Sequence, residues 1–106
     1  MPAGEGAQST SSRAAAIVEL SGDVDIASAD QVHDVLDRAI ASGRTGEVVV
    51  DLSQVSFMDC RGLDVLVSAH SVIGDRLILQ APSRQVRRLL DLTELRETFV
   101  VTDGDA

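Results

Sequence analysis

The sequence has no lysine, tryptophan or tyrosine, and it has one cysteine and two phenylalanines among 106 residues. A single cysteine excludes an internal disulfide, and so few aromatic side chains disfavour a binding site built on ring stacking. No apolar run approaches the roughly 20 residues of a membrane-spanning helix. The N-terminus lacks the charged and apolar segments of a signal peptide. We therefore expect a cytoplasmic protein with no membrane insertion.

Positive charge is also scarce. Nine arginines stand against 17 acidic residues, which gives a net charge of −8. A nucleic-acid partner is disfavoured, because phosphate binding needs a basic surface. Hydrophobic residues make up 44% of the chain, enough for a core without disulfide or metal staples. The composition therefore predicts one domain that suits a partner with basic patches.

The N-terminal segment differs in composition from the rest. Residues 1–12 are rich in Gly, Ala and Ser, so we expect a mostly flexible tail, part of which, near residues 10–13, could add an edge strand. The domain then occupies residues 13–106. Turn residues follow the first predicted strand at Ser21-Gly22-Asp23, and a polar loop is expected between the second strand and the second helix. Strands are predicted at residues 14–20, 47–52, 76–80 and 98–102.

Three helices alternate with these strands. The first, residues 28–41, begins at a Ser28-x-x-Gln31 capping box and places five apolar residues on one face: Val32, Val35, Leu36, Ala39 and Ile40. The second spans about residues 61–72 and ends at Gly74. Leu63, Leu66, Val67 and His70 share one of its faces, while Val65, Ala69 and Val72 lie elsewhere, so we expect this helix to be largely buried. The third begins at Ser83 as N-cap, with Val86, Leu89 and Leu90 inward.

This alternation predicts an α/β fold: a single domain with a mostly parallel or mixed sheet of four to five strands and packed helices. The run Val48-Val49-Val50 is apolar on both faces of its strand. Such a strand is typical of the centre of a sheet that is covered on two sides.

The segment Asp59-Cys60-Arg61-Gly62 follows a strand and begins a helix. In open α/β sheets, ligands and modifications collect at this edge, where helix N-termini point outward. The unpaired N–H groups of a helix N-terminus stabilise an added phosphate. A phosphate beside Asp59 would add about −1.5 to −2 charges and would disrupt a partner interface. The pattern therefore predicts a regulated contact surface.

Several motifs then point to one family. They are Gly22-Asp23-Val24-Asp25, Val50-Asp51-Leu52-Ser53, Phe57-Met58-Asp59, Gly62-Leu63, and Pro82 with Leu95 near the third helix. With them the chain resembles STAS domains of the bacterial anti-sigma factor antagonist type over nearly all of residues 14–101. In that family a serine usually follows the aspartate, and a partner kinase phosphorylates it. This chain departs from the pattern with Cys60-Arg61, and it is also short after the last strand.

The resemblance implies a protein that binds an anti-sigma factor of the serine-kinase type and releases its sigma factor. It implies no enzymatic activity, cofactor or metal, and it leaves the oligomeric state open. Cys60 would occupy the phosphoacceptor position. The partner-binding surface would contain Asp23, Asp25, Ser56, Met58, Asp59, Cys60, Arg61 and Gly62.

Several alternatives stay open at this stage. Cys60 is a small, half-buried packing residue, a position that cannot be phosphorylated, or a redox-sensing thiol, which the helix N-terminus favours and Asp59 opposes. Asp59 is an N-cap, a partner contact or both, and Asp25 forms a turn or a recognition loop. Ser53 or Ser56 could be phosphorylated instead. The domain could also serve a transporter or a stress-signalling assembly as an accessory subunit.

The remaining polar residues suggest no chemistry. His33 and His70 are isolated from each other and from other metal ligands. No Ser-His-Asp spacing, P-loop or carboxylate pair indicates catalysis. Arginines at 84, 87 and 88 are typical of a solvated helix face with acidic neighbours.

Overall fold

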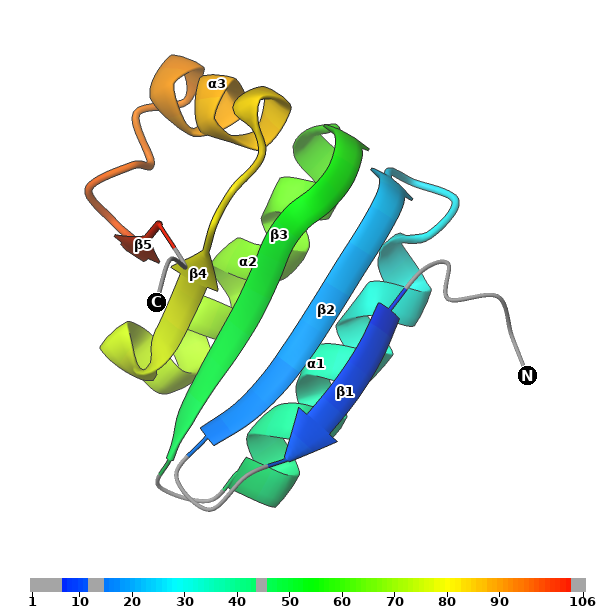
Figure 1. Cartoon of the computed structure of the whole chain (residues 1–106), viewed down its shortest axis with the longest axis vertical. Coiled ribbons are helices and arrows are strands. Elements are labelled where there is room, and N and C mark those ends of the chain that lie inside the picture. Colours follow the sequence, from blue (N-terminus) through cyan, green and yellow to red (C-terminus); the bar gives the residue numbers. More distant parts are fainter. Residues whose placement is uncertain (1–6, 12–14, 44–45, 104–106) are drawn as a thin grey trace.

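The computed structural model describes residues 7–11, 15–43 and 46–103. Five strands form one sheet in the order β1-β2-β3-β4-β5. They are β1 (Ala7–Ser11), β2 (Ala15–Val24), β3 (Glu47–Met58), β4 (Leu77–Gln80) and β5 (Val100–Thr102). The first is antiparallel to β2, and the other neighbours are parallel. The predicted α/β fold with a mixed sheet is therefore confirmed (Figure 1).

The helices are α1 (Ala29–Gly43), α2 (Cys60–Ile73) and α3 (Arg84–Leu92), with a short 3-10 turn η1 (Gly74–Arg76) before β4. Each α-helix connects two parallel strands, and each connection moves one strand further in the same direction. Right-handed crossovers of that kind place successive helices on the same side of a sheet. Figure 1 shows α1 and α2 together behind the sheet and α3 beside the upper end of β3.

Within residues 7–11, 15–43 and 46–103, no helix covers the other face of the sheet. Ile17, Val49 and Ile78 occupy neighbouring positions on that face and are only half-buried. For the described residues, the prediction of a sheet covered on two sides is therefore wrong. The apolar run in β3 instead supplies a fully buried row beneath α1 and α2 and a partly exposed row opposite.

The core lies between the sheet and these two helices. Its fully buried side chains include Val18, Leu20, Val50, Leu52, Leu66 and Leu79. Burying a leucine or valine side chain contributes roughly 1.5–3 kcal/mol. Most of the stabilisation of the fold therefore comes from side chains on the face of the sheet that α1 and α2 cover.

β2 and β3 are both longer than the sequence predicted. The expected turn at residues 21–23 lies within β2, and the expected polar loop after residue 52 lies within β3. The pairing shifts register between Glu19 and Ser21 and again between Gly22 and Asp23, and Gly22 has a φ of +73°. Such bulges let a polar, glycine-containing segment stay paired while the strand bends. Ser56 and Met58 therefore lie on a strand.

The N-terminal strand begins earlier than expected. β1 occupies residues that were assigned to the flexible tail, and it pairs with β2 from Ala7 to Ser11. The edge strand was predicted near residues 10–13; residues 12–14 lie outside the described part of the chain, as does the tail at residues 1–6. Backbone pairing with β2, which composition does not reveal, extends the sheet here.

The face that α2 buries also differs in part from the prediction. Leu63, Leu66, Val65 and Ala69 are buried, as expected for a largely buried helix, but Val67 and Val72 are exposed. The helix contacts both the sheet and α1, so its apolar stripe turns toward α1. Gly74 caps its C-terminus with a φ of 63°, and Ser83 accepts from the Val86 N–H as the N-cap of α3; both were predicted.

Candidate functional site

Two segments meet at the edge of the sheet where β2 and β3 end. Val24 and Met58 are neighbours across these parallel strands. The Asp59 N–H donates to the Val24 carbonyl oxygen at 3.2 Å. The loop before α1 and the first turn of α2 are thereby held side by side. This is the edge at which open α/β folds place their ligands.

Asp59 is the N-cap of α2. Its carboxylate accepts hydrogen bonds from the backbone N–H groups of Arg61 at 2.9 Å and Gly62 at 3.1 Å. Two donors of the helix N-terminus are thus already satisfied, so a phosphate at residue 60 would compete with this carboxylate as well as repel it. The capping role of Asp59 is shown by these bonds, and its contact with a partner stays a prediction.

Asp25 organises the loop before α1. Its carboxylate accepts from the N–H groups of Ala27 at 3.0 Å and Ser28 at 3.3 Å. The Ser28 hydroxyl accepts from the Asp25 N–H and donates to the Asp23 carbonyl, both at 3.0 Å. Ser28 thus turns toward the loop, and the predicted capping box with Gln31 gives way to this network. Asp25 is a turn former, and its role in recognition stays a prediction.

The predicted contact residues divide into exposed and buried ones. Asp23, Ser56, Cys60 and Arg61 are exposed, and Asp25 and Asp59 are half-buried. Cys60 is therefore a surface thiol, so the idea that it packs as a half-buried residue is wrong. In this exposed position in the first turn of α2, the Cys60 thiol is accessible from solvent.

Met58 and Gly62 are buried beneath this surface. A Cβ at Gly62 would lie 2.6 Å from the Val24 carbonyl oxygen and 2.7 Å from a Val24 methyl carbon. The start of α2 is thus pressed against the end of β2 more closely than any side chain allows. These two residues support the exposed surface from below, and their contact with a partner stays a prediction.

Two exposed apolar side chains border the site and were absent from the predicted surface. Ile26 is 68% exposed in the loop before α1, and Phe57 is 48% exposed at the end of β3. Phe57 is paired in register with Asp23. Exposed large apolar groups next to polar residues are common at protein interfaces. Ile26 could have been suspected from its polar neighbours, whereas Phe57 required the strand register.

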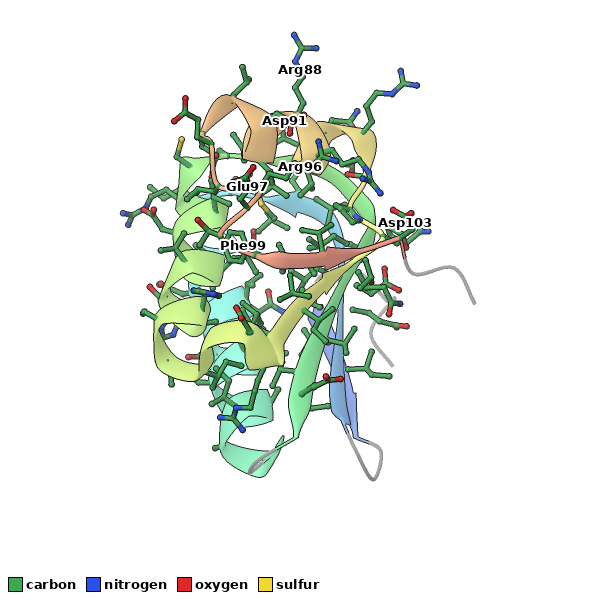
Figure 2. All side chains as sticks on the ribbon, turned by 90° about the vertical axis from the view of Figure 1, so that its left-hand side faces the viewer. Arg88, Asp91, Arg96, Glu97, Phe99 and Asp103 are labelled. Atoms are coloured by element: carbon green, nitrogen blue, oxygen red, sulfur yellow. The ribbon has the colours of Figure 1, made fainter. Side chains whose placement is uncertain are left out.

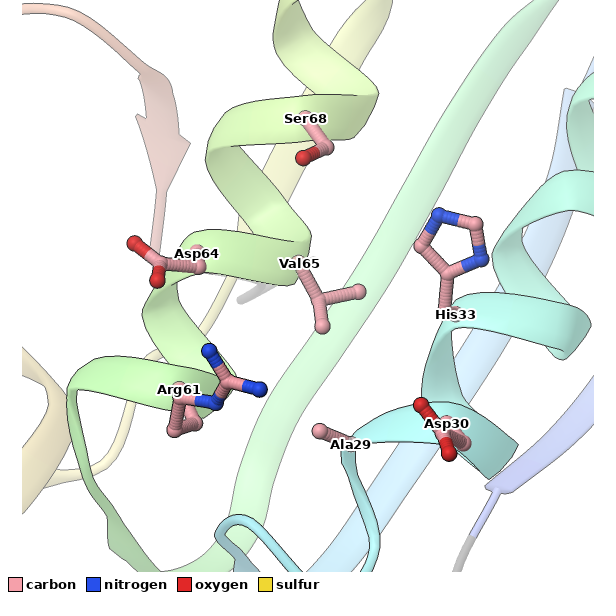
Figure 3. Close-up of a pocket in the computed structure, with 7 residues that line it drawn as sticks. All are labelled: Ala29, Asp30, His33, Arg61, Asp64, Val65 and Ser68. Atoms are coloured by element: carbon pink, nitrogen blue, oxygen red, sulfur yellow. The ribbon is translucent and has the colours of Figure 1, made fainter.

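A groove runs between α1 and α2 beside the site. It has a volume of about 170 Å³, and its walls carry Asp30, His33, Arg61, Asp64 and Ser68. Figure 3 shows the Arg61 guanidinium and the His33 ring on opposite walls. Both signs of charge are present, but no nucleophile is held by a base there. The groove thus presents acidic, basic and hydroxyl groups at one surface.

The histidines do not form a common site. His33 is exposed on α1 with its Nδ1 3.2 Å from the Asp37 carboxylate, whereas His70 packs edge-on against the Phe99 ring at the other end of α2, with ring centroids 5.5 Å apart. Within the described residues, no group of three or more His, Cys, Asp or Glu is placed to hold a metal ion. Nor is any helix in that part of the chain long and apolar enough to cross a bilayer.

Comparison with known proteins identifies the family to which this architecture corresponds. Residues 7–104 match the family described as the STAS domain. The chain is 30% identical over 96 residues to an anti-sigma F factor antagonist of Paenibacillus polymyxa, an alignment that covers 88% of this chain and 82% of that protein.

Solved structures share the fold. An anti-sigma factor antagonist from Mycobacterium paratuberculosis superimposes with a TM-score of 0.81 at 24% identity, covering 91% of this chain and 83% of that one. The Bacillus cell fate determinant SpoIIAA in its phosphorylated form gives a TM-score of 0.67 at 21% identity, over 90% of this chain and 89% of that one. The family match spans all of the described strands and helices. The chain belongs to the STAS domain family.

Proposed function

We propose that this protein is an anti-sigma factor antagonist that binds an anti-sigma factor of the serine-kinase type and releases its sigma factor. The observation that carries the proposal is the exposed first turn of α2, where Cys60 and Arg61 follow the capping Asp59 beside the Asp25 loop. The relative from Paenibacillus polymyxa, which is named an anti-sigma F factor antagonist, supports it. The protein would act in the cytoplasm by binding alone, without a cofactor.

The surface that would meet the anti-sigma factor combines charge with apolar area. Asp23, Ser56, Cys60 and Arg61 are exposed, and Ile26 in the loop before α1 and Phe57 near the end of β3 add exposed apolar side chains. A core of apolar contacts within a polar rim is the usual composition of a protein interface. Met58 and Gly62 would fix the position of the first turn of α2 relative to the end of β2.

Cys60 is the feature that separates this chain from the family pattern. The phosphorylated form of SpoIIAA shows that a phosphate can be carried by that protein, whereas Cys60 offers a thiol in place of the family's usual hydroxyl. We propose that the antagonist is permanently active because its own kinase partner cannot switch it off at this position.

Incubation with the cognate anti-sigma kinase and ATP is expected to leave residue 60 without phosphate. Intact-protein mass spectrometry followed by peptide mapping measures this directly. A Cys60→Ser variant is the matched control, because it restores the family's hydroxyl at almost the same size. A phosphate found on Cys60 would contradict the proposal, and one found on Ser56 or Ser53 would move the switch to that serine.

The Cys60→Glu variant is expected to bind the anti-sigma factor at least about tenfold more weakly, because like charges brought together in an interface cost several kcal/mol. The new carboxylate would lie next to that of Asp59. Titration calorimetry against the purified anti-sigma factor provides the measurement.

The Cys60→Gln variant controls for size without charge, and it should bind within a few-fold of the parent chain, as should Cys60→Ser. Equal affinities for the Glu, Gln and parent chains would remove this turn from the interface. A parent chain that binds no kinase-type anti-sigma factor would overturn the proposed function itself.

A further inference from the structure

The exposed side of α3 forms a basic strip outside the site described above. Arg84, Arg88 and Leu92 follow one another at intervals of four residues, which places them on one face of the helix. All three are exposed, and Leu92 is 74% exposed. We use "basic strip" for these three residues.

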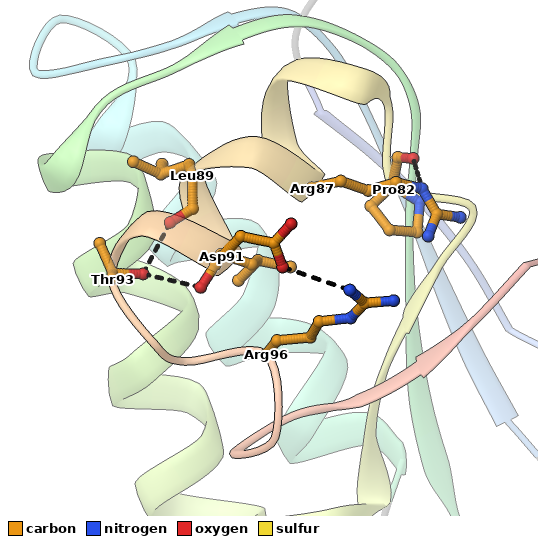
Figure 4. Close-up of polar contacts among 7 residues, drawn as sticks. Pro82, Arg87, Leu89, Asp91, Thr93 and Arg96 are labelled. Carbon is orange, nitrogen blue, oxygen red and sulfur yellow. Dashed lines mark hydrogen bonds and ion pairs between the residues drawn. The ribbon is translucent and has the colours of Figure 1, made fainter.

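The two arginines of the basic strip differ from the other arginines near α3. Arg87 donates to the Pro82 carbonyl oxygen at 3.0 Å and pairs with Asp103 at 3.0 Å. Arg96 pairs with Asp91 at 3.3 Å, and Figure 4 shows it folded back toward that carboxylate. Among the described residues, neither Arg84 nor Arg88 has such a partner, and Arg88 projects away from the body of the molecule (Figure 2). The expectation that this helix face pairs with local acidic residues therefore holds only for Arg87.

The basic strip lies near the edge of the sheet that carries the candidate site. α3 begins four residues after β4 ends, and it packs against β3. The first turn of α2 follows directly after the end of β3. Figure 1 shows α3 beside that end of β3. A partner of ordinary interface size, about 800 Å² on each side, could therefore cover both elements.

The basic strip is a local cationic site on an acidic chain. The net charge is −8, and exposed aspartates at 23, 30 and 64 lie near the starts of α1 and α2, with exposed Arg61 among them. Exposed Asp91 lies beside the basic strip, but it is paired with Arg96. The two free arginines therefore remain available to the carboxylates of a partner, and such charge pairs fix the orientation of a partner more than its affinity.

We propose that the basic strip binds an acidic segment of the anti-sigma factor, with carboxylates against Arg84 and Arg88 and an apolar side chain against Leu92. This inference rests on the proposed function and adds a second contact element to it. An anionic bilayer is a poorer occupant, because two free arginines on a chain of net charge −8 give little attraction to a negative surface.

The test measures binding of the anti-sigma factor to charge-reversal variants by titration calorimetry at low and at moderate salt. Arg88→Glu is expected to weaken binding at least about tenfold, and Arg84→Glu with Arg88→Glu further, with the effect shrinking as salt screens the charges. Leu92→Ala is expected to weaken binding by a similar amount at both salt concentrations.

Arg38→Glu is the matched control. Arg38 is also exposed, so this variant changes the net charge by the same amount as Arg88→Glu. Residue 38 lies about 13 Å along α1 from Ala29, the first residue of that helix, and so away from the candidate site. The variant should bind within about twofold of the parent, as distant surface charges are largely screened. Circular-dichroism melts should show all variants folded, since none of these side chains is buried.

Equal losses for Arg88→Glu and Arg38→Glu would overturn the inference in favour of a general effect of net charge. No loss for Arg84→Glu, Arg88→Glu and Leu92→Ala, beside a clear loss for Cys60→Glu, would overturn the inference and leave the proposed function intact. Binding of the parent chain to anionic vesicles that Arg88→Glu abolishes would also overturn it. A parent chain without affinity for the anti-sigma factor would overturn both.

Discussion

Replacing Leu66 by alanine is expected to lower the free energy of unfolding by about 2–5 kcal/mol. Leu66 is completely buried in the centre of α2 against the sheet, so truncation leaves a cavity that the surrounding side chains fill only in part. A domain of this size is stable by roughly 5–15 kcal/mol. The melting temperature should fall by at least about 10 °C, measured by circular dichroism, and partner binding should weaken only as far as the fold does.

The adjacent residue provides the control. Val67 follows Leu66 on the same helix but is 37% exposed on the side that faces away from the core. Val67→Ala should change the free energy of unfolding by no more than about 1 kcal/mol, partly because alanine is the better helix former. If Leu66→Ala melts at the temperature of the parent, α2 does not lie against the sheet as described.

Gly62→Ala is expected to destabilise the fold by roughly 1–3 kcal/mol, against the usual direction of a glycine-to-alanine change in a helix. Alanine alone would favour the helix by up to about 1 kcal/mol. The added methyl, however, would lie 2.6 Å from the Val24 carbonyl oxygen and 3.1 Å from the Met58 Cγ. Backbone rather than a flexible side chain blocks it, so α2 must move away from β2.

That movement should reach the candidate site. The Gly62 N–H donates to the Asp59 carboxylate at 3.1 Å, so displacing Gly62 disturbs the cap and the position of Cys60. Thermal melts and anti-sigma titrations on the same variant measure both effects. Ser68→Ala, an exposed change on the same helix, isolates the gain in helix propensity and should be neutral or slightly stabilising. A Gly62→Ala chain as stable as Ser68→Ala would show that β2 and α2 are not in close contact.

Much of the candidate site could be read from local sequence. Asp59, a small residue and a glycine between an apolar strand and an apolar helix define a capped helix start, and capping depends only on residues adjacent in the chain. The placement of Cys60 in the first turn of α2 follows from the same reasoning. Gly74 and Ser83 as helix boundaries also depend on local conformation alone.

Other features required the folded chain. The polar residues between Ser53 and Ser56 indicate a loop in isolation, but pairing with the bulged end of β2 keeps them in a strand. From the sequence alone, either Val65 or Val67 could be the buried residue of α2. The contact between α2 and α1 decides that Val65 is buried. In the described part of the chain, Arg87 is paired while Arg84 and Arg88 are free, and this depends on the position of Asp103, 16 residues further along the chain than Arg87.

The sequence by itself determined the order of strands and helices, the α/β class, the capped start of α2 and the family resemblance, because each rests on periodicity or on contacts within a few residues. Only the tertiary structure decided that α1 and α2 both lie on one face of the sheet and that α3 lies close to the candidate site. It also decided that Met58 and Gly62 are buried while Cys60, Ile26 and Phe57 are exposed. These features arise from contacts between segments far apart in the chain. Which of two apolar faces becomes buried depends on the direction of the crossovers and on the closeness of packing, and neither is encoded in any single segment.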